Sequence, residues 1–256
     1  MLPAEAIRIG SPGYPAGLAC IPSPPEILWV KGVPPPEGTV AIVGTRHPTR
    51  FGRDVAQRAA RVAVTSGLGV VSGLARGIDT VAHETALEAG GSTWAVLGSG
   101  VDVPTPVSNK GLAEDILARG GGLVSELPPT TPVSRCNLVA RDRIQSGLSL
   151  AVVICQCETS SGTMHTARFA VAQGRPLVVV RPRGDDAAVM ASSGNVALAD
   201  PGGCDPALLA ARGEVAELVR ARRPVADVVV DDPEELAELF GRLLSAQRRR
   251  SRSPRM

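Results

Sequence analysis

The amino-acid sequence predicts an α/β fold: a Rossmann-like, doubly wound and mostly parallel sheet with helices on both faces. Short apolar runs alternate regularly with longer helical stretches between residues 39 and 180. The apolar runs are nearly continuous rather than alternating, which suits parallel strands that are buried on both faces. Glycines directly follow several of these runs. Turns of this kind are typical of the edge at which such sheets bind ligands.

The apolar runs predict six strands, at Val40–Val43, Gly69–Val71, Thr93–Leu97, Leu123–Ser125, Leu150–Ile154 and Leu177–Val180. The helices expected between them span Gly52–Ser66, Ile78–Ala89, Lys110–Arg119 and Thr163–Gln173. Strand–helix alternation predicts right-handed crossovers. The carboxyl ends of parallel strands meet at one edge, so we expect Gly44, Gly73, Gly98 and the loop after Ile154 to lie there.

Composition divides the chain into three segments. Residues 1–38 are rich in proline and are expected to form an N-terminal arm that packs on the core. Residues 39–205 form the extended Rossmann-like domain, and residues 206–256 form a small C-terminal segment. The arm is expected to pack through Ile27, Leu28, Trp29 and Val30.

The C-terminal segment contains one strong helix signal. Asp232-Pro233-Glu234-Glu235 combines an N-cap residue, a proline in the first turn and a glutamate that reaches back. We expect this helix to end near Ala246, and the arginine-rich tail beyond it to be disordered. The stretch from Pro182 to Pro206 has many glycines and little periodicity, which predicts loops.

Composition also limits the class of protein. The net charge of +2 provides no overall basic surface for nucleic acid, although arginines cluster at 220–223 and 248–255. Five irregularly spaced cysteines without a C-x-x-C pair favour buried free thiols in a reducing compartment over disulfides or a zinc site. We find neither a leader-like N-terminus nor an apolar run of about 18 residues. These features predict a cytoplasmic protein with no membrane partner.

Two strand-to-helix loops carry the residues of a phosphate site. Gly44-Thr45-Arg46 follows the first predicted strand, and Gly73 to Arg76 follows the second. Glycine allows close backbone approach, arginine supplies charge, and helix N-termini attract anions. Ser161-Gly162-Thr163 begins a later helix, where the hydroxyls could donate to phosphate, cap the helix, or do both. Gly98 ends a further strand at the same edge.

In their order, the motifs resemble the DNA-processing protein A family, also called Smf, over about residues 8–205. The resemblance implies a protein that binds single-stranded DNA, protects it and loads the RecA recombinase in transformation or recombination. It further implies a homodimer without a cofactor, a metal or catalytic residues. The matching motifs include Ile42–Arg46, Val70–Asp79, Ala95–Gly98, Ser125–Pro128, Gly147–Ser149 and Ser161–Thr163.

Departures from the family pattern bear on the expected DNA contacts. The family commonly has asparagine between two arginines, where this chain has Asp142 between Arg141 and Arg143. The carboxylate should weaken phosphate attraction. Each arginine contacts DNA, pairs with Asp142 or is exposed to solvent. Lys110 is expected to replace a basic residue that the family has three positions earlier.

For some candidate residues a structural role competes with the functional one. Arg76 contacts DNA or forms an ion pair with Asp79 or Glu126. Asp79 and His83 are four residues apart and could form a metal or acid–base pair, but capping and packing explain them better. Among the few aromatic residues, Phe51 is the one expected to stack on bases. Recognition should therefore depend on phosphates and salt, with little sequence preference.

A nucleotide-binding protein or an enzyme is the alternative. The same fold superfamily contains phosphoribohydrolases that act on nucleoside monophosphates, marked by a glycine-rich stretch that ends in a glutamate. The matching stretch of this chain, from Thr159, ends in Thr166, so the carboxylate for acid–base chemistry is missing. Gly44-Thr45-Arg46 also lacks the G-x-G-x-x-G pattern of dinucleotide-binding enzymes. The sequence therefore favours a DNA-binding protein.

Overall fold

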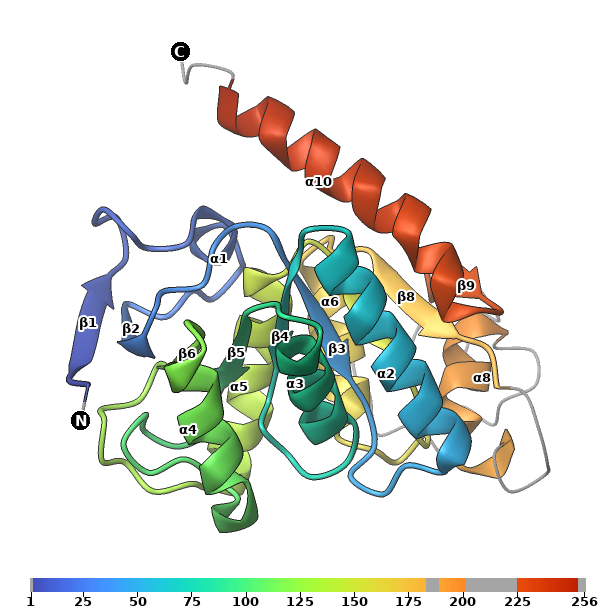
Figure 1. The fold of residues 1–256 in the computed structure, drawn as a ribbon, viewed down its shortest axis with the longest axis horizontal. Coiled ribbons are helices and arrows are strands. Elements are labelled where there is room, and N and C mark those ends of the chain that lie inside the picture. The colour runs from blue at the N-terminus through green and yellow to red at the C-terminus, as the bar shows by residue number, and fades with distance from the viewer. Residues whose placement is uncertain (1, 183–188, 201–224, 253–256) are drawn as a thin grey trace.

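The computed structural model describes residues 2–182, 189–200 and 225–252, which fold around one nine-stranded sheet (Figure 1). The strands are β1 (Ala4–Arg8), β2 (Ile27–Gly32), β3 (Thr39–Val43), β4 (Gly69–Ser72), β5 (Thr93–Val96), β6 (Gly122–Ser125), β7 (Val152–Ile154), β8 (Leu177–Val180) and β9 (Val228–Val230). Their order is β1-β2-β6-β5-β4-β3-β7-β8-β9. The strands from β6 to β9 in this order pair in parallel, whereas β1 and β2 pair antiparallel.

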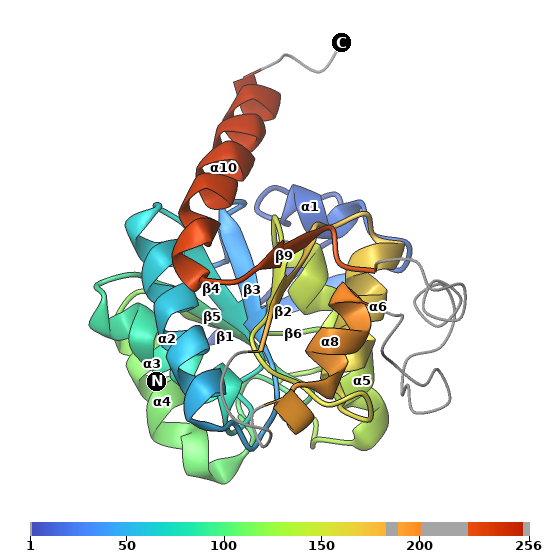
Figure 2. The ribbon, with the colours of Figure 1, turned by 90° about the vertical axis from the view of Figure 1, so that its right-hand side faces the viewer.

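Helices cover both faces of the sheet, which confirms the predicted doubly wound α/β class. They are α1 (Ala16–Ala19), α2 (Arg50–Thr65), α3 (Ile78–Glu88), α4 (Lys110–Ala118), α5 (Arg135–Leu148), α6 (Thr163–Ala172), α8 (Ser193–Ala199) and α10 (Leu236–Arg252), with 3-10 turns η1 (Val107–Asn109) and η4 (Pro233–Glu235). Helices α2, α3, α4 and α10 pack on one face, and α1, α5, α6 and α8 on the other (Figure 2).

The central strands are buried on both faces and carry mostly apolar side chains. In β3, Val40 and Ile42 pack with α2, whereas Ala41 and Val43 pack with α6. From β3 the chain proceeds to β4, β5 and β6 in one direction, and α5 then returns it to β7 on the other side of β3. The strand order therefore reverses between β3 and β7. Loops leave these two strands toward opposite faces, and ligands bind at such switch points.

The structure contains the six predicted strands and the four predicted helices with small differences at their ends. Helix α5, however, was not predicted. The N-terminal arm does more than pack through its apolar residues: β1 and β2 extend the sheet beyond β6, and Leu28 and Val30 are buried there. The predicted C-terminal segment adds β9 beside β8. One sheet therefore includes strands from all three predicted segments.

The predicted capping box is confirmed at the start of the C-terminal helix. The side chain of Asp232 accepts from the Glu234 amide at 2.9 Å, and that of Glu235 accepts from the Asp232 amide at 2.8 Å. The expected end near Ala246 is wrong, because α10 continues to Arg252 and projects from the body of the molecule (Figure 1). The tail predicted to be disordered is therefore partly helical, and residues 253–256 lie outside the described part of the chain.

Two further expectations are corrected or limited by the structure. Within the expected loop region from Pro182 to Pro206, residues Ser193–Ala199 form α8, and residues 183–188 and 201–206 lie outside the described chain. Of the described cysteines, Cys155 and Cys157 are buried free thiols as predicted, whereas Cys20 and Cys136 are exposed. Cys204 lies outside the described residues. In the described ranges, none of the helices combines the length and apolarity that a membrane span requires.

Candidate functional site

A pocket of about 550 Å³ opens at the switch point between β3 and β7. Its walls are the loop after β3, the N-terminal half of α5 and the loop that leads from β7 into α6. The structure therefore brings together much of the predicted phosphate site. The predicted residues that line the pocket are Gly44, Thr45, Arg46, Arg141, Ser161, Gly162 and Thr163.

The loop after β3 is held tightly, which leaves Arg46 exposed at the rim. A Cβ atom on Gly44 would lie 2.6 Å from Ile78 Cγ1 and 2.7 Å from the Gln156 carbonyl oxygen, so only glycine fits there. The Thr45 amide donates to the same Gln156 carbonyl at 2.7 Å. This amide is therefore committed to the fold, and the charge of Arg46 is what the loop offers to an anion.

The first turn of α6 forms the opposite wall. Ser161 Oγ accepts from the Thr163 amide at 3.2 Å and lies 3.1 Å from Thr163 Oγ1, so the predicted capping role is present. Gly162 is exposed, and nothing lies within 4 Å of a Cβ atom built on it. The Met164 and His165 amides are also paired, with the Ser161 and Gly162 carbonyls at 3.1 and 2.9 Å. What faces the open space, and suits an anion, is therefore the positive end of the helix dipole.

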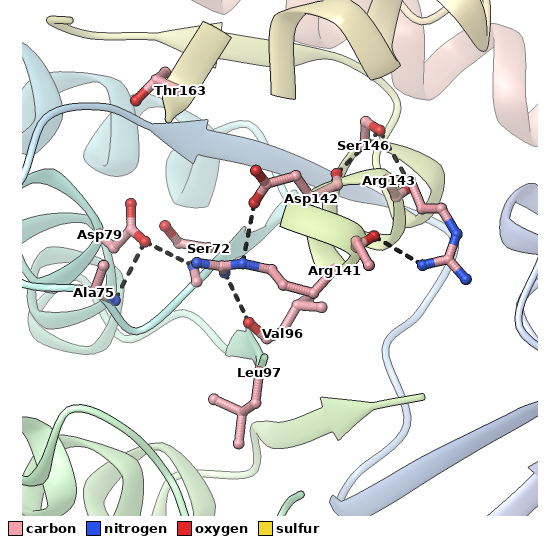
Figure 3. Close-up of polar contacts among 12 residues, drawn as sticks. Ser72, Ala75, Asp79, Val96, Leu97, Arg141, Asp142, Arg143, Ser146 and Thr163 are labelled. Carbon is pink, nitrogen blue, oxygen red and sulfur yellow. Dashed lines mark hydrogen bonds and ion pairs between the residues drawn. The ribbon is translucent and has the colours of Figure 1, made fainter. Parts of the chain in front are cut away.

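A buried arginine forms the floor of the pocket. Arg141 is 6% exposed, and its Nη1 donates to the Val96 carbonyl at 2.8 Å. Its Nε lies 3.0 Å from Asp142 Oδ1. Figure 3 shows the guanidinium extending from α5 between this carboxylate and Val96. The alternative in which Arg141 pairs with Asp142 is the one the structure contains.

Two buried carboxyl groups balance this cation. Asp79 accepts from the amides of Gly73 at 3.1 Å and Ala75 at 3.3 Å, and burial raises its pKa against the attraction of Arg141. Burial also raises the pKa of Asp142 to about 7, although Arg141 and Arg46 oppose the shift. Because a protonated carboxyl carries no charge, these shifts leave the cation of Arg141 only partly neutralised at neutral pH. Exposed Arg46 and Arg135 line the pocket, as does exposed Glu158.

Four predicted site residues lie outside the pocket lining and have other surroundings. The Gly73 amide donates to the Asp79 carboxylate. Gly98 lies against Leu138 of α5, and a Cβ atom on residue 98 would be 2.8 Å from Leu138 Cδ2. Arg76 is exposed, with its Nε 3.4 Å from Ser108 Oγ, and forms no ion pair with Asp79 or Glu126, both of which the structure describes. Lys110 is exposed at the start of α4.

Arg143 is also outside the pocket, because it points to the other side of α5. Its Nη1 and Nη2 form a fork with the Glu126 carboxylate at 2.7 and 2.6 Å. Its Nε donates to the Ser23 carbonyl at 2.8 Å. Arg143 therefore ties the N-terminal arm and the loop after β6 to α5, and it does not pair with Asp142.

The pocket-lining residues that sequence reasoning missed include Arg135, Gln145 and Glu158. Gln145 is 1% exposed, and its Nε2 atom has no hydrogen-bond partner within the described chain. Residues 141, 142 and 145 share one face of a helix because three- and four-residue spacings do so. This spacing was visible in the sequence, but only the prediction of α5 would have made it meaningful.

Asp79 and His83 have the structural roles that the sequence favoured. His83 is fully buried, its Nδ1 lies 2.7 Å from Thr93 Oγ1, and burial lowers its pKa to about 3. The described residues contain no group of three His, Cys, Asp or Glu side chains placed to hold a metal ion. Phe51, the expected base-stacking residue, is half-buried and packs against the core.

Comparison with known proteins gives consistent similarities. The family model for DNA recombination-mediator protein A matches residues 5–202. Protein Smf from Synechocystis is 41% identical over 169 residues, covering 62% of this chain and 41% of the relative. DNA processing protein DprA from Bacillus subtilis is 37% identical over 179 residues, covering 69% of this chain and 60% of the relative. The chain thus spans about half the length of these relatives.

Solved structures of similar proteins have the same architecture. DNA processing protein A from Streptococcus pneumoniae matches with a TM-score of 0.69 and 26% identity, covering 96% of this chain and 74% of that one. DNA processing protein A from Helicobacter pylori matches with a TM-score of 0.67 and 25% identity, covering 86% and 95%. The work on the latter concerns its single-stranded DNA binding mode.

Proposed function

The chain belongs to the DNA recombination-mediator protein A family, and we propose that it binds single-stranded DNA at the pocket between β3 and β7. The observation that carries the proposal is the joint position of exposed Arg46 and the N-terminus of α6 on the same pocket. A cation and a helix N-terminus that face each other across an open space form a favourable site for a phosphate group.

We expect the rim of the pocket to contact DNA and its floor to maintain the shape of the pocket. Arg46 and Arg135 at the rim are free to approach the phosphates of a strand, because both are exposed. Arg141 in the floor is committed to Val96 and Asp142, so its role is to hold the pocket in shape. Few exposed aromatic residues are available for stacking. We therefore expect phosphate contacts to dominate, with strong dependence on salt.

The proposed function is binding rather than catalysis. Thr166 occupies the position at which the related phosphoribohydrolases have a glutamate, and it is buried beside the pocket. Asp79 accepts two backbone hydrogen bonds and is committed to the fold. Asp142 is held beside Arg141 on α5, and it does not occupy the position of the missing glutamate on α6. Release of a free base from a panel of nucleoside monophosphates, measured by chromatography, would support the enzymatic alternative.

Family membership supports further proposals about the whole protein. We propose that it acts in the cytoplasm as a homodimer, protects the bound strand and delivers it to the RecA recombinase in transformation or recombination. Sedimentation analysis tests the dimer. Co-precipitation with RecA in the presence and absence of single-stranded DNA tests the delivery step. If RecA is not co-precipitated under either condition, this proposal is contradicted.

Fluorescence anisotropy with a labelled oligonucleotide of thymines, repeated over a range of salt concentrations, tests the DNA-binding proposal. Arg46→Ala should weaken binding several-fold and reduce the slope of log K against log salt by about 0.7, the value for one phosphate contact on a single strand. Arg61→Ala removes an exposed arginine of α2 outside the pocket and is the matched control. Equal salt slopes for Arg46→Ala and the wild type contradict the site assignment.

A further inference from the structure

Asp142 and Gln145 lie three residues apart on α5, and both line the pocket. Asp142 is 8% exposed and Gln145 is 1% exposed. Their spacing places the two side chains on one face of the helix. The floor of the pocket thus presents a carboxylate acceptor beside an amide donor. Both groups lie deeper than the exposed residues of the rim.

The amide of Gln145 is unmatched within the described chain, because its Nε2 has no hydrogen-bond partner. A buried polar group without a partner costs about 1–3 kcal/mol, so folded proteins rarely retain one. The neighbouring carboxylate also retains acceptor capacity. Its Oδ1 pairs with Arg141 Nε and the Thr166 side chain also bonds to it, but an ionised carboxylate has about four lone-pair positions. Both groups therefore have hydrogen bonds to offer to a molecule in the pocket.

We propose that Asp142 and Gln145 bind the hydrogen-bonding edge of one unstacked nucleobase and select guanine. This inference rests on the proposed binding of single-stranded DNA, and it adds a base preference that the composition does not suggest. Guanine presents two adjacent donors, N1–H and the 2-amino group, next to the O6 acceptor. The two oxygens of Asp142 accept from the donor pair, and the Gln145 carboxamide, turned so that its enclosed Nε2 faces the pocket, donates to O6.

The other bases fit this pair less well. Thymine has one donor between two carbonyl oxygens, whereas adenine and cytosine have one amino group beside an acceptor nitrogen. In each case the second oxygen of Asp142 faces another acceptor. The pocket volume of about 550 Å³ lies within the range of small-molecule sites, so it has room for one nucleotide. Its phosphate would lie toward Arg46 and the first turn of α6.

The test compares short oligonucleotides of thymines that differ at one central base. Replacement of one thymine by guanine should tighten binding by about 5- to 150-fold, the range expected for a bidentate contact to the correct base. Hypoxanthine lacks the 2-amino group and should lose most of this advantage. Adenine at the same position should gain none. Because these changes lie in the ligand, none of them affects the folding of the protein.

Protein variants then assign the preference to the two side chains. At a pH above 7, where Asp142 is mostly ionised, Asp142→Asn should abolish the advantage of guanine while it tightens binding of the all-thymine strand, since a negative charge is lost. Glu158→Gln is the matched control, because it removes an exposed carboxylate from the same pocket. It should retain the preference for guanine. Gln145→Met keeps a similar volume without the donor and should reduce the preference.

The possible outcomes separate this inference from the proposed function. If no oligonucleotide binds at low salt, the proposed DNA binding fails and the base preference fails with it. If the thymine strand binds but guanine gives no advantage, only the base preference is overturned. A preference for guanine that persists in Asp142→Asn also overturns it.

Discussion

Gly73 lies against Arg141 so closely that a Cβ atom on residue 73 would come within 1.6 Å of the Arg141 Nη1 atom. The backbone of Gly73 is not in the left-handed region, so the reason for glycine is space alone. The buried guanidinium of Arg141 thus packs directly against the backbone at the end of β4. This explains why glycine follows Ser72, the last residue of the strand: the missing side chain leaves room for a cation from α5.

Gly73→Ala should destabilise the protein. The added methyl group displaces Arg141, which breaks the bond to the Val96 carbonyl and the pairing with Asp142. Loss of hydrogen bonds by a buried charged group costs about 1–3 kcal/mol. Urea unfolding followed by circular dichroism measures the loss.

The control for this prediction is Gly111→Ala on α4, where nothing lies within 4 Å of the added Cβ atom. Alanine is preferred to glycine within a helix by about 0.5–1 kcal/mol, so this variant should be slightly more stable than the wild type. A stability of Gly73→Ala that equals that of the wild type would show that Arg141 has a second, equally good position.

Arg143→Met should weaken folding but not DNA binding. The variant removes the fork to Glu126 and the bond to the Ser23 carbonyl, while the hydrophobic stem remains. Loss of these contacts leaves a half-buried carboxylate unpaired, which costs about 1–3 kcal/mol. Thermal unfolding should show a lower Tm. The salt dependence of oligonucleotide binding should match that of the wild type, and a shallower slope with an unchanged Tm would instead assign Arg143 to phosphate.

The fold was predictable because its strands carry a strong hydrophobic signal. Runs such as Val40–Val43 and Leu177–Val180 are apolar at every position, which is what burial on both faces requires. Helix α5 lacks such a signal, since its buried face includes Arg141, Asp142 and Gln145. A helix that buries polar residues has no apolar periodicity to detect. The helix that forms the floor of the pocket was therefore not detectable from the sequence pattern.

The same limit applies to the candidate site. Arg141 and Arg143 are equivalent in the sequence, but residues two apart on a helix point in nearly opposite directions. One arginine therefore enters the pocket floor and the other ties down the N-terminal arm. The glycine loops at the edge of the sheet were predictable from the strand ends. The partners of buried charges were not, because they depend on contacts between distant segments.

The titration of Asp142 should lower the free energy of unfolding as the pH rises from about 4 to about 7. Burial raises its pKa in the folded state to about 7, while Arg141, Arg46 and Thr166 oppose the shift and Asp79 adds to it. The folded state then holds a proton that the unfolded state has released, so unfolding becomes easier as the pH rises. Asp142→Asn should show a smaller decrease in unfolding free energy between about pH 4 and about pH 7, the two ends of this window. Identical pH profiles of variant and wild type contradict the protonated carboxyl.

His83 should have the opposite effect on pH dependence. The Thr93 hydroxyl donates to the Val70 carbonyl at 2.8 Å, so it accepts from His83, and the proton of the neutral imidazole lies on Nδ1. Burial lowers the pKa of His83 to about 3, whereas an unfolded histidine titrates near 6.5. Its contribution to stability is therefore present above about pH 6.5 and is lost as the pH falls toward 3. His83→Gln, which cannot titrate, should lose less stability on acidification in urea unfolding experiments. Addition of Zn²⁺ at neutral pH tests the alternative in which His83 and Asp79 bind a metal: a rise in the Tm of the wild type that His83→Gln abolishes would contradict the packed, neutral imidazole.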